Sequence, residues 1–128
     1  MPQARIAIVE DSPVMQAILT DAVQGAGFVI AWTGQNGLEA VEKYRAARPD
    51  AVIMDIVMPT MNGIDALDAI IKEDPGARVV MASSISDART VVQCLHKGAR
   101  RYVVKPYSGS DIVKTLETVL AETAGSAS

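Results

Sequence analysis

Short, almost continuous apolar runs alternate along this chain with longer segments in which apolar residues recur every three or four positions. This alternation constrains the fold more than any other feature of the sequence. Four runs are nearly wholly apolar, which is typical of parallel strands buried on both faces: residues 6–9, 51–54, 79–82 and 102–104. A fifth strand is expected over residues 28–33, where the composition is more mixed, and we place it at a sheet edge.

A segment with helical spacing follows each of these runs. The five segments are marked by apolar residues on one helical face: Met15, Leu19 and Val23; Ala40, Val41 and Tyr44; Ile64, Leu67 and Ile70; Val91, Val92 and Leu95; Ile112, Leu116 and Val119. Ser12 is expected to cap the first helix, and Ser108 or Ser110 the last. Five strand–helix repeats predict an α/β fold, (βα)5, in which a doubly wound, five-stranded parallel sheet carries helices on both faces.

Length and composition limit the kind of protein this can be. With 128 residues, 49% of them apolar, we expect one domain over residues 1–122, followed by a flexible tail or linker stub over 123–128. A net charge of -3 gives no reason to expect a nucleic-acid-binding surface. The apolar runs are too short to cross a bilayer, and the first residues lack a signal-peptide pattern, so a cytoplasmic protein is the simplest interpretation.

Polar side chains appear where the predicted strands end. Glu10 and Asp11 follow the first strand, Asp55 the third, Ser83 the fourth and Lys105 the fifth. In doubly wound sheets, chemistry gathers beyond the carboxyl ends of the strands. Three carboxylates brought together there repel one another unless a cation joins them. Because every candidate ligand is an oxygen atom, a hard divalent ion such as Mg²⁺ is expected.

Together these residues resemble the receiver domain of two-component response regulators, most of all the single-domain chemotaxis (CheY-like) type. The resemblance runs from about residue 6 to 120 and rests on these motifs: Glu10-Asp11, Asp55, Met58-Pro59-x-x-Asn62-Gly63, Ser83, Gly98-Ala99 and Tyr102-Val103-Val104-Lys105-Pro106. It implies the strand order 2-1-3-4-5 and a signalling module whose only catalysis is its own phosphorylation and dephosphorylation.

The resemblance also implies a role for each acidic residue. Asp55 would accept a phosphoryl group from a sensor histidine kinase or a phosphotransfer protein. Asp11 and Asp55 would ligate Mg²⁺ directly, together with the backbone carbonyl of Val57, and Glu10 would hold the ion through water.

The remaining roles concern the switch and its output. Lys105 would pair first with Asp55 and then with the phosphoryl oxygens, and its bond to Pro106 would be cis. Ser83 would hydrogen-bond a phosphoryl oxygen, and Tyr102 would rotate into the space behind it. A downstream protein would then bind the face of the fourth helix, fifth strand and fifth helix, and the chain would act as a monomer or a phosphorylation-dependent dimer. We expect six residues of that face to be available for contact: Arg89, Gln93, His96, Tyr102, Val104 and Lys114.

Other functions stay open at this point. The chain could be the receiver of a multidomain effector, either a methylesterase, since the Ser83–Ser84 pair also resembles receivers that precede chemotaxis methylesterase domains, or a transcription regulator. A Mg²⁺-dependent aspartyl phosphatase usually carries a second aspartate two residues after the nucleophile, where this chain has Val57. A flavodoxin-like cofactor binder is disfavoured because the acidic loop over residues 10–13 would repel a phosphate. Taken singly, Asp11 could assist helix capping and Lys105 could be a solvated lysine.

Two apolar residues sit where relatives influence the access of water to the phosphoryl group. They are Val57, two residues after the acceptor, and Ile85, two residues after Ser83. Neither side chain can orient an attacking water. We therefore expect slow self-dephosphorylation.

Overall fold

The computed structural model describes residues 3–122 and contains one sheet of five parallel strands in the order β2-β1-β3-β4-β5. The strands are β1 (Arg5–Val9), β2 (Val29–Gly34), β3 (Ala51–Met54), β4 (Val79–Ser83) and β5 (Arg101–Val104). The helices are α1 (Pro13–Gly25), α2 (Gly37–Ala46), α3 (Gly63–Glu73), α4 (Ala88–His96) and α5 (Gly109–Ala121). The predicted α/β class and the strand order 2-1-3-4-5 are both confirmed.

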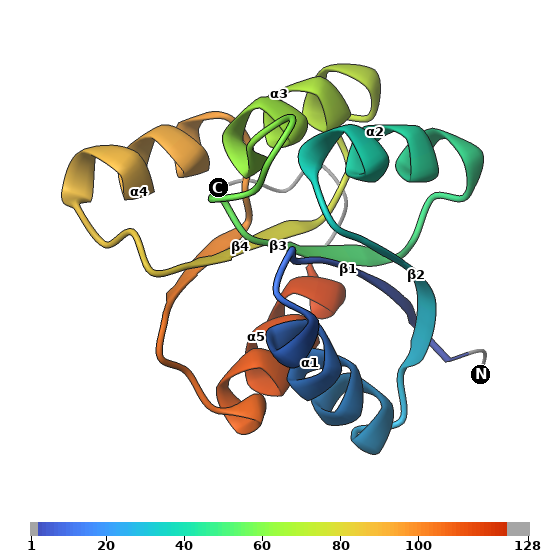
Figure 1. Cartoon of the computed structure of the whole chain (residues 1–128). Coiled ribbons are helices and arrows are strands. Elements are labelled where there is room, and N and C mark those ends of the chain that lie inside the picture. The colour runs from blue at the N-terminus through green and yellow to red at the C-terminus, as the bar shows by residue number, and fades with distance from the viewer. Residues whose placement is uncertain (1–2, 123–128) are drawn as a thin grey trace.

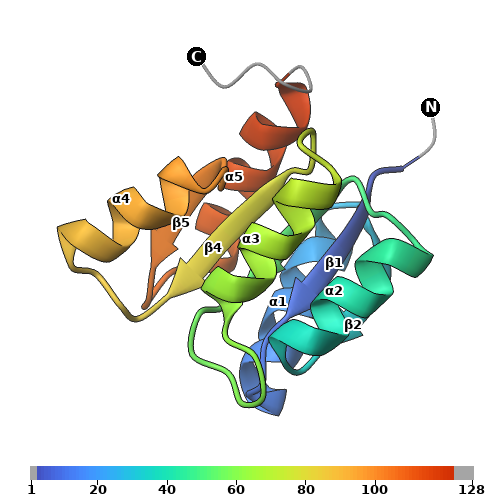
Figure 2. The ribbon, with the colours of Figure 1, turned by 90° about the horizontal axis from the view of Figure 1, so that it is seen from above.

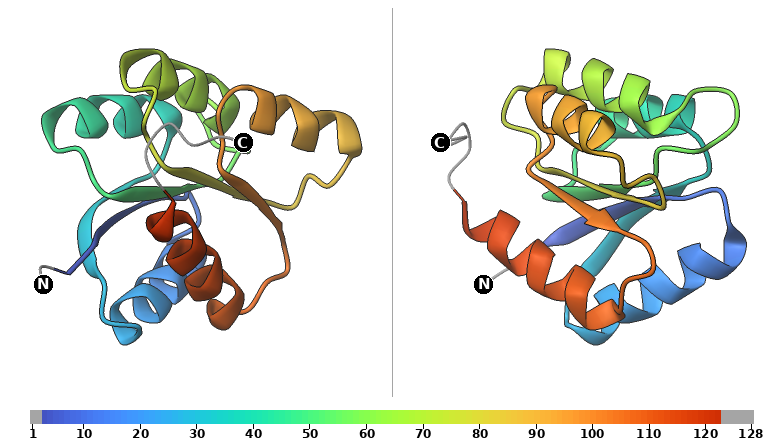
Figure 3. Two further views of the ribbon diagram at one scale, coloured as in Figure 1. Left: turned by 180° about the vertical axis from the view of Figure 1, so that it is seen from behind. Right: turned by 90° about the vertical axis from the view of Figure 1, so that its left-hand side faces the viewer.

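The helices cover both faces of the sheet. Figure 1 shows α2, α3 and α4 on one face and α1 and α5 on the other, and the two views of Figure 3 show the same layers from behind and from the side. Successive residues of β1 alternate between the two cores: Ile6 and Ile8 pack toward α1 and α5, whereas Ala7 and Val9 pack toward α2 and α3. The near-continuous apolar runs therefore arise because the central strands are buried on both faces.

The two edge strands differ in how well the sequence predicts them. β2 lies at one edge, as its mixed composition indicates. β5 was expected to be buried on both faces, and that expectation was wrong: it lies at the other edge, its residues are half-buried or exposed, and 41% of Val104 is exposed. A three-residue apolar run cannot distinguish a central strand from an edge strand whose outer face is apolar.

Side-chain caps and glycines determine where the helices begin and end. Ser12 caps α1, and Ser108, not Ser110, caps α5 in a capping box with Asp111. After α1 and α4 the chain turns through Gly27 (φ 93°) and Gly98 (φ 110°), a backbone region that glycine adopts without steric cost. The tail predicted over 123–128 lies outside the described residues, and no helix within residues 3–122 is long and apolar enough to span a membrane.

Candidate functional site

The reversal of strand order places two carboxylates side by side. The chain leaves β1 toward one side of the sheet and β3 toward the other, which opens a crevice beyond their carboxyl ends. In Figure 2 the arrowheads of β1 and β4 point to the same edge of the sheet. Glu10 follows β1 directly and Asp55 follows β3, and the Asp55 backbone N–H donates to the Val9 carbonyl at 3.0 Å. The two acids are therefore fixed by the parallel ladder itself.

Three carboxylates converge in this crevice. One oxygen each of Glu10, Asp11 and Asp55 lies within 4.8 Å of the others. Glu10 and Asp55 are buried, with 2% and 7% of their surfaces exposed, whereas Asp11 is exposed. A cluster of three carboxylate oxygens at this spacing suits a hard divalent cation, so these residues could hold a metal ion.

Lys105 connects two of these acids. Its backbone N–H donates to the Ser83 carbonyl at 2.9 Å, which brings the end of β5 to the site. Its Nζ donates to Glu10 Oε1 at 2.8 Å and to Asp55 Oδ2 at 2.9 Å. The contact with Asp55 was expected from the sequence, but the contact with Glu10 was not. No sequence signal reports it, because it depends on how far the lysine reaches across the crevice. The bond between Lys105 and Pro106 is cis, as the resemblance implies.

Burial and pairing shift the ionisation of these groups. Burial raises the pKa of the Glu10 carboxyl above its usual range, against the opposing effect of the Lys105 amine. Burial alone would lower the pKa of Lys105, but its hydrogen bonds to Glu10 and Asp55 outweigh burial and raise that pKa. One amine among three carboxyl groups leaves the crevice with fewer positive groups than acidic ones, which favours a bound cation.

The loop between β3 and α3 is held against Asp55 by a close backbone approach. A Cβ atom on Gly63 would lie 1.9 Å from the Asp55 carbonyl oxygen, so only glycine fits there. Asn62 caps α3 by accepting from the backbone N–H groups of residues 64 and 65, both at 2.9 Å. The sequence singled out Asn62–Gly63 as part of the motif shared with the family, but gave no sign of this close approach. Val57, in the same loop, is 59% exposed beside the acids.

Ser83 and Tyr102 contact the same residue of the loop between β4 and α4. Ser83 is fully buried, and its Oγ accepts from the Ile85 N–H at 3.3 Å. The Tyr102 hydroxyl donates to the Ile85 carbonyl, and the half-buried ring packs against the core. Burial raises the pKa of Tyr102, which therefore stays a neutral donor. The serine at the site and the tyrosine on the outer strand are thus linked through one loop residue.

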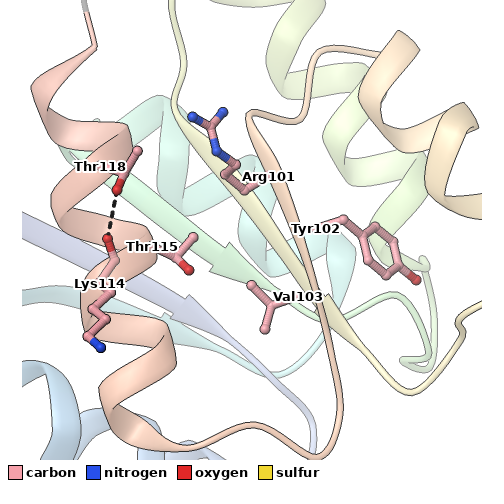
Figure 4. A pocket seen from close by; sticks show the side chains of 6 residues that line it. All are labelled: Arg101, Tyr102, Val103, Lys114, Thr115 and Thr118. Atoms are coloured by element: carbon pink, nitrogen blue, oxygen red, sulfur yellow. Dashed lines mark hydrogen bonds between the residues drawn. The ribbon is translucent and has the colours of Figure 1, made fainter.

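The residues predicted to contact a partner lie on three neighbouring elements, since β5 contacts both α4 and α5. Five of the six are exposed and Tyr102 is half-buried: Arg89, Gln93 and His96 on α4, Tyr102 and Val104 on β5, and Lys114 on α5. Between β5 and α5 lies an open pocket of about 220 Å³ (Figure 4), lined by Arg101, Tyr102, Val103, Lys114, Thr115 and Thr118. In that view the Tyr102 ring points away from α5.

The sheet, the crevice at its switch point and the acid–lysine cluster define a class of protein: this chain belongs to the response regulator receiver domain family, whose sequence profile matches residues 6–117. Within that family it is similar to the chemotaxis protein CheY of Thermotoga maritima. The two are 42% identical over 115 residues, which are 90% of this chain and 96% of that protein.

Solved structures agree with this assignment. The structure described as the CheX–CheY–BeF3–Mg complex from Borrelia burgdorferi matches with a TM-score of 0.91 and 35% identity, over 95% of this chain and 92% of that one. The response regulator domain of Thermotoga maritima CheB matches with a TM-score of 0.88 and 30% identity, over 95% of this chain and 99% of that one. The family predicted from the sequence is confirmed, and with it a role in signalling.

Proposed function

We propose that the chain is a cytoplasmic phosphorylation switch in which Asp55 accepts a phosphoryl group from a phosphohistidine of a sensor kinase or phosphotransfer protein. One observation carries this proposal: Asp55 is a buried carboxylate at the switch point, with Lys105 at 2.9 Å and two further acids close by. A purely structural aspartate would not need these neighbours, since burying two acids beside one amine, with a third acid close by, is unfavourable unless the site is used.

The transfer itself breaks one bond and forms another. An Asp55 carboxylate oxygen attacks the phosphorus, the P–N bond of the donor breaks, and its electron pair returns to the imidazole, which takes up a proton. The Asp55 Oδ1 accepts from the Ile56 N–H at 2.7 Å and its Oδ2 from Lys105, so the carboxylate is fixed in orientation before the donor arrives. After transfer the Lys105 amine neutralises a phosphoryl oxygen, and the Ser83 hydroxyl donates to another.

Mg²⁺ fits the all-oxygen set of donors at this site. The carboxylates of Asp11 and Asp55 and the backbone carbonyl of Val57 would hold it, with Glu10 acting through water. When bound, the ion supplies positive charge that stabilises the phosphoryl oxygens during transfer.

Phosphorylation then changes the output face through the loop that contains Ile85. A phosphoryl group adds about two negative charges and accepts a hydrogen bond from the Ser83 hydroxyl. In the unphosphorylated protein that hydroxyl accepts from the Ile85 N–H. The Ile85 carbonyl accepts from Tyr102, so a shift of this loop moves the tyrosine and favours one of two arrangements of α4, β5 and α5. A downstream protein that prefers one arrangement reads the signal at Arg89, Gln93, His96, Tyr102, Val104 and Lys114.

A phosphoryl analogue tests this proposal without a kinase. Beryllium trifluoride with Mg²⁺ should shift the amide resonances of residues around Asp55 and of α4, β5 and α5 in the wild-type protein. The Asp55→Asn variant, which keeps size but removes the nucleophilic carboxylate, should show no such shifts. Equal shifts in both proteins, or shifts confined to a region remote from the crevice, would contradict the proposal.

A further inference from the structure

Gln16 lies in the second turn of α1, and its side chain reaches back to the ends of two strands. Its amide nitrogen Nε2 donates to the Glu10 carbonyl at 3.1 Å and to the Gly34 carbonyl at 3.2 Å. A primary amide has two N–H groups, so it can serve both acceptors at once. The Gly34 carbonyl also accepts from the Glu10 N–H at 3.0 Å. The Gln16 amide therefore closes the end of the β1–β2 ladder at the point where the acidic loop begins.

These contacts determine the orientation of the backbone from which Asp11 projects. The peptide unit between Glu10 and Asp11 is planar, so holding the Glu10 carbonyl fixes the plane in which the Asp11 nitrogen lies. Asp11 is exposed, and its carboxylate faces two other acids within 4.8 Å. Mutual repulsion of the three acids favours swinging Asp11 outward into water, because Asp11 is the only one of the three that is not buried.

We propose that Gln16 is a positioning residue for the metal site: its two hydrogen bonds to backbone carbonyls hold the Glu10–Asp11 peptide so that the Asp11 carboxylate stays beside Glu10 and Asp55. The inference rests on the proposed function, in which Asp11 ligates Mg²⁺. A neutral amide suits this task, since it supplies two donors without adding a charge that would compete with the cation. Partly buried, Gln16 is also shielded from water, which strengthens both bonds.

The test compares two glutamines of the same helix. Gln16→Met keeps the length of the side chain and removes both donors, and Gln24→Met makes the same change at an exposed position near the other end of α1. Isothermal titration of the metal-free proteins with Mg²⁺ should give a dissociation constant about tenfold higher for Gln16→Met and an unchanged one for Gln24→Met. In the metal-free state, the Asp11 amide resonance should shift in Gln16→Met, with the amides of β4 unmoved.

A second variant separates positioning from simple destabilisation. Gln16→Asn keeps a polar amide but is one methylene shorter and cannot reach both carbonyls, so it should weaken Mg²⁺ binding even where its thermal unfolding midpoint in EDTA equals that of the wild type. Mg²⁺ binding as tight as in the wild type, in a folded Gln16→Met or Gln16→Asn protein, would overturn the inference. Failure of the wild-type protein itself to bind Mg²⁺ would instead overturn the proposed function.

Discussion

At the scale of single residues, the site is defined by one amine shared between two buried acids. Lys105 lies within 2.9 Å of both Glu10 and Asp55, so losing either acid leaves the lysine paired with the other. Glu10 is the more deeply buried acid, and its raised pKa means that burial disfavours its charged form more than the lysine favours it. Ionisation of Glu10 therefore makes the folded, metal-free protein less stable.

The raised pKa of Glu10 predicts how stability depends on pH in the absence of metal. The folded protein holds a proton on Glu10 more tightly than the unfolded chain does, for which 4.5 is the ordinary value. The free energy of unfolding should therefore decrease as the pH rises from that value through the raised pKa. Glu10→Gln removes the titrating group and with it this part of the pH dependence. Urea unfolding of both proteins in EDTA, at several pH values between about 4.5 and 8, measures the difference.

A constant difference in unfolding free energy between wild type and Glu10→Gln across this pH range would show that Glu10 titrates normally. A difference that moves in favour of the variant as the pH rises would support the raised pKa.

At the scale of elements, the loop between β3 and α3 depends on one glycine. Gly63 donates its backbone N–H to the Ile56 carbonyl at 2.9 Å, and a Cβ on Gly63 would lie 1.9 Å from the carbonyl oxygen of Asp55. Asp55 and the start of α3 are consequently held together as one unit. The loop itself is tight: Thr60 has φ 68°, in the left-handed region that a β-branched residue rarely adopts, within a turn closed by Met61 N–H to the Pro59 carbonyl at 2.7 Å.

Adding a single methyl group to Gly63 tests this unit. Gly63→Ala should destabilise the protein by about 3 kcal/mol and move Asp55, because a Cβ 1.9 Å from a carbonyl oxygen forces the backbone apart. Gly25→Ala is the matched control, since a Cβ there has no neighbour within 4 Å and should stabilise α1 by up to about 1 kcal/mol. Denaturant unfolding gives both values, and a Gly63→Ala protein as stable as the wild type would refute the close approach.

The elements also show what a sequence can and cannot predict. Strand–helix alternation predicts all five repeats, because buried parallel strands and amphipathic helices leave different periods in the sequence. The exposure of β5 was missed, because the outward-facing Val104 is as apolar as a core residue. Val104 belongs to the face proposed to bind a partner. A residue buried in the core and a residue that contacts a partner are both often apolar, so the sequence alone does not separate the two.

At the scale of the whole molecule, the residues of the crevice come from strands that are far apart in sequence and adjacent in the sheet. Their presence could be predicted because parallel strands deliver their carboxyl ends to one edge. The Lys105–Glu10 bond and the Gly63 approach could not be predicted, because they depend on how far a side chain reaches and on how closely two backbone segments approach each other.

The lifetime of the phosphorylated state should be set by what surrounds the crevice. Val57 is exposed beside the acids and Ile85 lies in the loop next to Ser83, and neither offers a hydrogen bond to an attacking water. The purified phosphoprotein should therefore decay slowly, over minutes or longer. Val57→Asn, which can orient a water, should speed decay by about tenfold. Val29→Asn makes the same change at an exposed position at the start of β2, at the end of the strand away from the crevice, and should not. Decay of the wild-type phosphoprotein within seconds would refute the idea.

The acceptor itself can be identified by mass. The protein is incubated with a small phosphodonor and Mg²⁺, its intact mass is measured, and the modified residue is located by peptide mapping after reduction of the acyl phosphate. The account predicts that wild type gains one phosphoryl group, on Asp55, and that Asp55→Asn gains little or none. A phosphoryl group on another residue, or equal modification of the two proteins, would contradict it.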